Sequence, residues 1–127
     1  MTAAALVTQG YTLADVGTDH GYIPIYLLQQ KKIPAAIAMD INEGPLERAK
    51  EHIALYGLQA YIQTRLSDGV AALKPGEVEA VLIAGMGGGL VMHILKNGEQ
   101  VCQSAKELIL QPPSEIANDR EFLRAAG

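Results

Sequence analysis

A loop with two glycines, set between an apolar segment and an amphipathic segment, constrains the fold of this chain more than any other feature. The apolar residues 11–16 predict a strand, and an amphipathic helix is predicted from Tyr22 onward. Gly17 and Gly21 suit the tight turn between such a strand and helix, which is typical of sites for nucleotide-like cofactors. The loop alone is equally consistent with a structural turn in which Asp19 caps the helix.

The acidic residues of this segment, Asp15 and Asp19, favour a cationic cofactor. In the Gly-x-Gly-x-x-Gly pattern of dinucleotide sites, the three defining positions here hold Gly17, Asp19 and Tyr22. Asp19 would repel a pyrophosphate, and a dry loop would strengthen that repulsion. The same carboxylates would stabilise the sulfonium and amino groups of S-adenosylmethionine (SAM), so SAM is the expected cofactor.

Apolar runs alternate with helical patterns along the rest of the chain, which predicts βαβ units and a mainly parallel sheet. Further strands are expected at residues 35–41, 61–66, 80–84 and 108–111. Helices are expected at residues 22–31, 42–56, 90–96 and 115–125, with Asn42 as an N-cap and Gly57 as a stop. Right-handed crossovers then give a three-layer, Rossmann-like doubly wound α/β fold with strand order 3-2-1-4-5.

Acidic residues also lie at the ends of the next two predicted strands. Asp40 lies 19 residues after Gly21, near the spacing at which a carboxylate binds ribose hydroxyls, a contact that NAD and SAM share. In Ser67-Asp68-Gly69, the carboxylate could accept a hydrogen bond from an adenine amino group while Gly69 allows close backbone approach. The structural alternatives are the polar end of a strand for Asp40 and an ordinary Asp-Gly turn for Asp68.

A second glycine-rich segment follows the central predicted strand 80–84. Four of the five residues 85–89 are glycine, which leaves backbone open to a flat acceptor or to the methionine part of the cofactor. The alternative is a flexible turn before the next helix. His52, His93 and Cys102 are interpreted as structural residues, and no metal site is expected, because no His, Cys or carboxylate spacing matches one.

The composition of the chain limits the number of domains, the kinds of partner and the cell compartment that can be expected. The 127 residues are 49% hydrophobic, which predicts one domain spanning residues 1–127 with a substantial core. A net charge of −4 argues against a large basic surface for nucleic acid. The sequence contains neither an apolar run long enough to span a membrane nor a secretory signal, and its single cysteine agrees with a reducing compartment. We therefore expect a soluble cytoplasmic protein without a membrane partner.

Three segments together resemble the class I SAM-dependent methyltransferases, and more narrowly the bacterial tRNA (adenine-22-N1)-methyltransferases. They are residues 14–24 (Ala-Asp-Val-Gly-Thr-Asp-His-Gly-Tyr-Ile-Pro), 67–69 (Ser-Asp-Gly) and 83–88 (Ile-Ala-Gly-Met-Gly-Gly). Leu110-Gln111-Pro112 fits the same pattern. The order and spacing of these segments match the family over nearly the whole chain.

The resemblance implies cofactor contacts at the ends of the strands. The expected cofactor-binding residues are Asp15, Gly17, Asp19, Gly21, Asp40, Ile41, Asp68, Gly69, Gly85, Met86 and Gly87. Asp19 and His20 are the catalytic candidates, because either side chain could orient the base or accept a proton from its exocyclic amine.

The activity that the resemblance implies is methyl transfer from SAM to N1 of adenosine 22 in tRNA. Adenine N1 carries an in-plane lone pair that can attack the sulfonium methyl directly, so catalysis can depend mainly on alignment. Enzymes that methylate exocyclic amines usually carry Asn/Asp-Pro-Pro-aromatic where this chain has Gly85-Met86-Gly87-Gly88. The alternatives are a noncatalytic SAM- or nucleotide-binding module, a methyltransferase with another acceptor, and an NAD-dependent oxidoreductase.

The chain departs from the family pattern at its ends. Such enzymes usually continue with two more strands and a helical extension that helps to hold tRNA. We therefore expect an incomplete methyltransferase domain, whose tRNA partner needs the additional segment. The predicted strand 108–111 would then be an exposed edge, which favours self-association.

Overall fold

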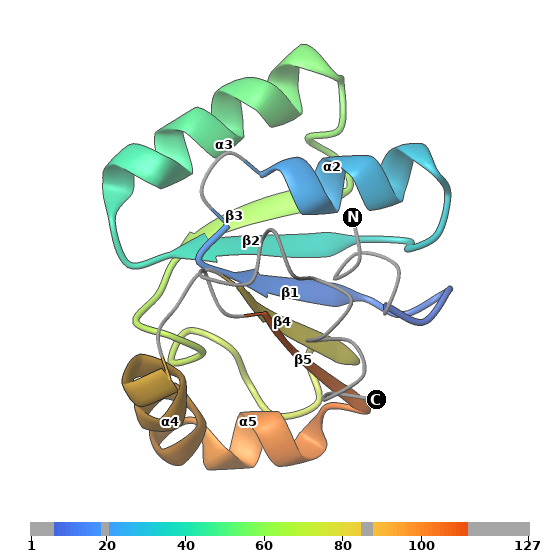
Figure 1. The fold of residues 1–127 in the computed structure, drawn as a ribbon. Coiled ribbons are helices and arrows are strands. Elements are labelled where there is room, and N and C mark those ends of the chain that lie inside the picture. Colours follow the sequence, from blue (N-terminus) through green and yellow to red (C-terminus); the bar gives the residue numbers. More distant parts are fainter. Residues whose placement is uncertain (1–6, 19–20, 85–87, 112–127) are drawn as a thin grey trace.

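Five parallel strands form one sheet in the computed structural model of this chain, of which residues 7–18, 21–84 and 88–111 are described (Figure 1). The strands are β1 (Leu13–Val16), β2 (Ala36–Asp40), β3 (Ile62–Leu66), β4 (Ala80–Ala84) and β5 (Glu107–Gln111). Their order across the sheet is β3-β2-β1-β4-β5, and each neighbouring pair is parallel. The strand order and the Rossmann-like α/β class predicted from the sequence are confirmed.

Helices cover both faces of the sheet. On one face lie α2 (Tyr22–Gln29) and α3 (Glu43–Leu55), and on the other lie α4 (Gly88–Asn97) and α5 (Glu99–Ser104) (Figure 1). The sequence pattern did not predict α5, because six residues make fewer than two turns and show no clear helical period. The helix expected at residues 115–125 lies outside the described residues.

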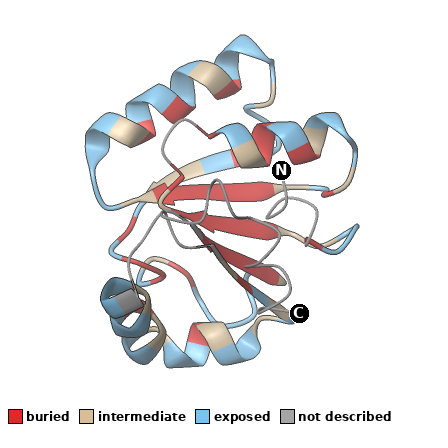
Figure 2. Ribbon diagram, in the orientation of Figure 1, coloured by how far each residue is buried: buried red, intermediate tan, exposed pale blue. Residues whose placement is uncertain are grey.

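Two hydrophobic cores fill the space between the sheet and its helices. Side chains of a strand alternate between faces, so Leu13 packs in the core beneath α2 and α3, whereas Ala14 packs in the core beside α4. The central strands β1, β2 and β4 are buried along nearly their whole length (Figure 2). Burial on both faces explains why β4 is a continuous apolar run and why β1 and β2 are apolar apart from Asp15 and Asp40.

Residues in the left-handed region end two of the helices. Gly57, the predicted stop of α3, has φ +70°, and its N–H donates to the carbonyl of Ala54 over 3.1 Å. The N–H of Leu58 donates to the carbonyl of Ile53 over 3.0 Å, which completes a Schellman motif. Lys31 has φ +57° in the corresponding place after α2, so this helix ends at residue 29, two residues before the predicted end.

The first strand is also shorter than predicted. Tyr11 belongs to a turn, since its N–H donates to the carbonyl of Thr8 over 3.2 Å, and the parallel ladder begins only at Leu13. Its apolar ring packs against the core without joining the sheet. The side chain of Tyr11 therefore contributes to the core although its backbone is not paired in the sheet.

Candidate functional site

The carboxyl ends of β1, β2 and β3 meet at one edge of the sheet. The N–H groups of Gly17 and Thr18, just past β1, both donate to the carbonyl of Met39 in β2, over 2.9 and 2.8 Å. The N–H of Ser67, just past β3, donates to the carbonyl of Asp40 over 2.9 Å. Backbone bonds thus join the three strand ends at which the sequence analysis expected ligand contacts, as is typical of ligand sites in open α/β sheets.

Both glycines of the loop after β1 adopt conformations that side chains disfavour. Gly17 has φ +76° and Gly21 has φ +75°. A Cβ atom on Gly21 would lie 3.3 Å from the Cβ of Ala49 in α3, so the loop also packs closely against that helix. Gly21 is the N-cap residue of α2, and Asp19 lies outside the described residues, so the structural alternative in which Asp19 caps this helix stays a prediction.

Asp15 lies inside β1, beneath the loop rather than at its surface. It is 2% exposed, and the hydroxyl of Thr18 donates to its Oδ2 over 2.8 Å. Burial raises the pKa of Asp15 to about 6, the Thr18 bond opposes that rise, and the charge of Asp40 adds to it. Asp15 is therefore an acidic residue that supports the loop from below.

Asp15 and Asp40 face the same side of the sheet. Asp15 pairs in register with Ala38, and Asp40 follows two residues later on the same strand, so both carboxylates point toward α2 and α3. Asp40 is half-buried, and its Oδ1 accepts the N–H of Asn42 over 3.0 Å. Two neighbouring carboxylates create a negative region that suits a cation.

The segment between β2 and α3 differs from the sequence prediction in one respect. Asn42 occupies the N-cap position with extended backbone angles, as predicted, but its side chain makes no capping bond within the described structure. The side chain of Asp40 instead accepts the backbone N–H of Asn42. Ile41, an expected cofactor contact, is 59% exposed beside this turn, where it could cover a planar ring.

The loop after β3 presents Asp68 at the surface. Ser67 is buried beneath it, and its hydroxyl donates to the carbonyl of Gly69 over 2.8 Å and accepts the N–H of Ala72 over 3.1 Å. Gly69 has φ +61°, and a Cβ atom there would lie 3.0 Å from Ile94 in α4. Asp68 is thus the exposed acid on a closely packed turn.

A small pocket separates this loop from α4. It measures about 220 Å³ and lies between Asp68, Val70 and Ala71 on one side and His93, Ile94, Asn97 and Gly98 on the other. His93 and Asn97 form a 2.9 Å hydrogen bond with each other along the helix. The pocket has a mixed polar and apolar lining, and it lies beside the strand ends, where ligands of open α/β sheets bind.

Five of the expected site residues are not placed. Asp19, His20, Gly85, Met86 and Gly87 lie outside the described residues, so both catalytic candidates and most of the second glycine segment stay sequence predictions. Their neighbours in the chain are placed, since β4 ends at Ala84 and α4 begins at Gly88. The described part of the site is therefore its β1, β2 and β3 side.

The residues interpreted as structural have packing contacts. Cys102 is partly buried beside the core of α4 and α5, and burial raises the pKa of its thiol, which lowers its reactivity. The ring of His52 stacks on Tyr22, with 5.2 Å between ring centroids. Among the described residues, no three His, Cys, Asp or Glu side chains cluster closely enough to hold a metal ion. The same part of the chain contains no helix with the length and apolar character needed to cross a membrane.

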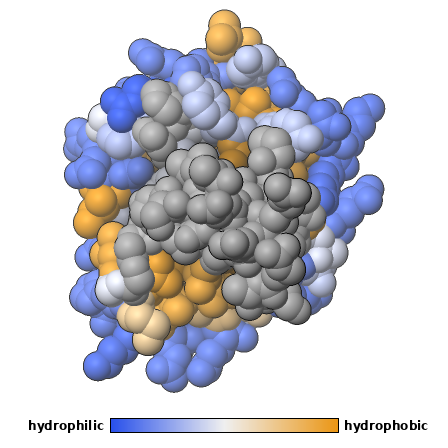
Figure 3. Space-filling model, viewed as in Figure 1, coloured by the Kyte–Doolittle hydropathy of each residue, from blue (hydrophilic) through white to orange (hydrophobic). Residues whose placement is uncertain are grey.

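Exposed apolar residues accompany the α4 side of the molecule. Leu90 and Met92 on α4 and Leu108 on β5 are exposed. Figure 3 shows hydrophobic surface in the lower half of the view, toward α4 and α5.

Sequence reasoning missed two groups that shape the site. Thr18, three residues after Asp15, places a hydroxyl on the buried carboxylate, and the Asp-x-x-Thr spacing in a tight turn was an available signal. Arg65 and Glu77 form an ion pair across the loop that carries Asp68. They are 12 residues apart with no helix between them, so no local pattern connects them.

Comparison with known proteins gives consistent matches. Residues 1–127 match the family model of a methyltransferase domain. The chain is similar to the tRNA (adenine(22)-N(1))-methyltransferase of Bacillus subtilis, with 40% identity over 122 residues, which are 96% of this chain and 51% of that protein.

Two solved structures extend this similarity to the fold. Streptococcus pneumoniae Sp1610 in complex with S-adenosyl-L-methionine has a TM-score of 0.84 and 40% identity, covering 98% of this chain and 59% of that one. M. capricolum TrmK in complex with S-adenosyl-homocysteine (SAH) has a TM-score of 0.75 and 38% identity, covering 85% of this chain and 48% of that one. The chain spans about half the length of the B. subtilis enzyme and somewhat more than half of a putative tRNA methyltransferase of Mycoplasma pneumoniae, to which it is 34% identical.

Proposed function

Because this chain belongs to the methyltransferase domain family, we propose that it binds SAM and serves an enzyme that methylates N1 of adenosine 22 in tRNA. The observation that carries the proposal is the meeting of three acid-bearing strand ends, with Asp15, Asp40 and Asp68, at one edge of the sheet. The 40% identity to the B. subtilis enzyme supports the choice of acceptor.

The described residues fit the chemical groups of SAM. The half-buried Asp40 can accept hydrogen bonds from ribose hydroxyls, and the exposed Asp68 can accept one from the adenine amino group. Gly17 and Gly21 keep side chains away from the turn, which lets a ligand approach its backbone. SAM, when bound, supplies a methyl group activated by a sulfonium, and the negative charge of Asp15 and Asp40 favours that cation.

The proposed reaction requires alignment more than proton transfer. The lone pair of adenine N1 forms a bond to the methyl carbon while the bond from that carbon to sulfur breaks. The positive charge passes from sulfur to the adenine ring, and N1 has no proton to lose. Holding nucleophile, methyl and sulfur in line is the kind of positioning that can supply roughly 7–11 kcal/mol at best. We propose that Asp19 and His20 help to orient the base.

The tRNA partner needs positive surface that this chain largely lacks. Its net charge is −4, whereas phosphate binding depends on Lys and Arg side chains. We propose that the main tRNA contacts of the whole enzyme lie outside these 127 residues, and that the enzyme acts in the cytoplasm on tRNA.

Two experiments test this proposal. Calorimetric titration of the chain with SAM, SAH and NAD should give saturable binding of the first two; binding of NAD alone would refute the proposed cofactor. Methyl transfer is then measured by mass spectrometry with the whole enzyme, on unmodified tRNA and on the same tRNA with guanosine at position 22. We expect 1-methyladenosine only in the tRNA that has adenosine at position 22. SAM binding without methylation would favour the noncatalytic module, and methylation elsewhere would favour another acceptor.

A further inference from the structure

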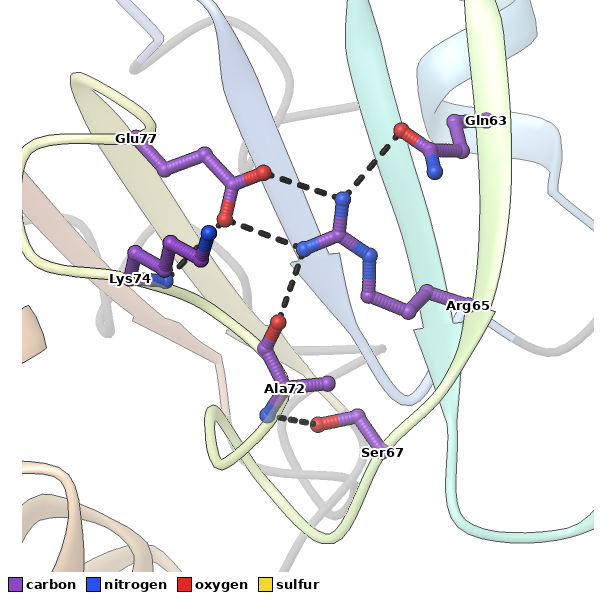
Figure 4. A network of polar contacts seen from close by, with 6 residues as sticks. All are labelled: Gln63, Arg65, Ser67, Ala72, Lys74 and Glu77. Atoms are coloured by element: carbon purple, nitrogen blue, oxygen red, sulfur yellow. Dashed lines mark hydrogen bonds and ion pairs between the residues drawn. The ribbon is translucent and has the colours of Figure 1, made fainter.

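Arg65, on β3, holds the loop that follows its own strand. Its Nη1 donates to the carbonyl of Ala72 over 2.8 Å (Figure 4). Nη1 and Nη2 also donate to the two carboxylate oxygens of Glu77, over 3.0 and 2.9 Å. The two side chains are only 21% and 29% exposed, so this bidentate pair is better shielded than an ordinary surface ion pair.

The carboxylate of Glu77 also binds the backbone at the far end of the loop. Oε1 of Glu77 accepts the backbone N–H of Lys74 over 3.0 Å, in addition to its bond from Arg65. Arg65 therefore contacts the loop at Ala72 and, through Glu77, at Lys74. Residues 67–79 contain turns but no helix or strand in the described structure, so these side-chain bonds replace a regular backbone ladder.

The hydroxyl of Ser67 connects this support to the tip of the loop. It accepts the N–H of Ala72, the residue whose carbonyl Arg65 binds, and it donates to the carbonyl of Gly69. Asp68 lies between Ser67 and Gly69, the two residues that the bond from this hydroxyl joins. A displacement of Ala72 would therefore move the turn that presents Asp68.

The position of this loop decides the width of the pocket beside α4. Asp68, Val70 and Ala71 form one wall of the pocket of about 220 Å³, and residues of α4 form the other. The apolar anchors Val70 and Leu73 fix the buried side of the loop, whereas Arg65 fixes its polar side. The position of this pocket wall thus depends on the ion pair between Arg65 and Glu77 as well as on the packing of Val70 and Leu73 in the core.

We infer that Arg65 and Glu77 are positioning residues, which hold the loop carrying Asp68 at the distance from α4 that the adenosine end of the cofactor requires. This inference rests on the proposed function for the identity of the ligand. Neither side chain needs to touch the ligand, because Ala72 and Ser67 transmit their effect.

The test uses three variants of the full chain. Arg65→Met keeps the apolar stem but removes every donor, Arg65→Lys keeps the charge without the bidentate geometry, and Glu77→Gln removes the acceptor charge. Calorimetry measures SAM and adenosine affinity, chemical denaturation measures stability, and hydrogen exchange measures protection of the amides of residues 68–74.

Two controls separate positioning from general stability. Lys106→Met breaks an ion pair of 3.6 Å with Glu79, just before β5 and away from the strand ends of the site. Ile33→Val trims a buried side chain just before β2, away from the carboxyl ends of the strands, and should lower the midpoint of chemical denaturation because it leaves a small cavity. Both variants should bind SAM and adenosine as the parent chain does.

For Arg65→Met we expect about a tenfold loss of SAM and adenosine affinity, with Arg65→Lys recovering part of it. Glu77→Gln should lose less affinity. A fourth variant that combines Arg65→Met with Glu77→Gln should resemble Arg65→Met alone, because both changes break one interaction. Faster exchange should be confined to the loop.

Unchanged affinity in Arg65→Met, or an equal loss in Ile33→Val, would overturn the inference. If the parent chain binds no SAM, the proposed function fails, and hydrogen exchange still decides the inference: a loop equally protected in Arg65→Met would refute it.

Discussion

The hydroxyl of Thr18 donates a 2.8 Å hydrogen bond to Oδ2 of Asp15, a carboxylate that is 2% exposed in the central strand of the sheet. This bond opposes the desolvation that raises the pKa of Asp15. It also ties the strand end to the glycine turn that follows it. One carboxylate of the site, that of Asp15, therefore lies inside the sheet rather than on the loop.

Asp15→Asn should change how stability depends on pH. The pKa of Asp15 is raised from 3.8 to about 6 on folding, so its contribution to stability is full below pH 3.8 and is lost as pH rises through about 6. The asparagine side chain does not titrate, so the free energy of unfolding should shift in favour of the variant by about 2 kcal/mol between pH 4.5 and 7.5. Urea denaturation at both values measures this difference, and a constant difference would contradict it.

Asp40→Ala should weaken SAM binding. Loss of hydrogen bonds from the ribose hydroxyls to a charged group is worth about 1.5–3 kcal/mol, which calorimetric titration at pH 7.5 would measure. Glu47→Ala, which removes an exposed acid of α3, is the control for net charge and should leave the affinity unchanged. If Asp40→Ala binds SAM as tightly as the parent chain does, Asp40 is not part of the site.

Gly21→Ala should affect both stability and ligand binding. A side chain at φ +75° costs about 1–2 kcal/mol, and the new methyl group would also press on Ala49 in α3. Gly10→Ala is the matched control, because Gly10 has φ +89° and a Cβ atom there would meet no described atom within 4 Å. Thermal denaturation should show the larger loss in Gly21→Ala, and only that variant should weaken SAM binding. Equal losses would show that packing against α3 is unimportant.

Lys31→Gly should stabilise the chain. Lys31 has φ +57° at the end of α2, a conformation that glycine adopts without steric cost. We expect a gain of about 0.5–1 kcal/mol in the free energy of unfolding, after the added flexibility of the unfolded chain is subtracted. Lys31→Ala, which removes the charge and keeps the Cβ atom, should give no gain, and a gain there would assign the effect to charge instead.

The edge strand β5 should mediate self-association of this chain. β5 is the terminal strand of the described sheet, and Leu108 on it is 41% exposed. Open strand edges pair readily, and a lysine on the edge discourages pairing. Sedimentation should detect concentration-dependent dimers of the parent chain and mainly monomers of Leu108→Lys. A parent chain that stays monomeric would refute this expectation.

Local pattern was sufficient for most of the fold. The strands predicted at residues 35–41 and 80–84 form β2 and β4, and the predicted stop at Gly57 ends α3 through its left-handed conformation. The errors were at element ends and in short elements. Lys31 follows α2 in the left-handed conformation, which the residue type lysine does not predict. The helix α5 is too short to show a helical period in its sequence.

The site was predictable as a set of strand ends but not in its interactions. Asp40 ends its strand and Asp68 follows the next one, and parallel strands bring such ends to one edge. The burial of Asp15 and its bond from Thr18 depend on which face of the sheet each side chain takes and on what covers it.

The sequence by itself determined the order of the strands and the acidic residues at their ends, because hydrophobic period, glycine placement and chain spacing are properties of neighbouring residues. Only the tertiary structure decided that Asp15 is buried with a raised pKa and that Arg65 supports the loop carrying Asp68. Desolvation and ion pairing depend on atoms that folding brings together from distant parts of the chain, so they have no signature in local pattern.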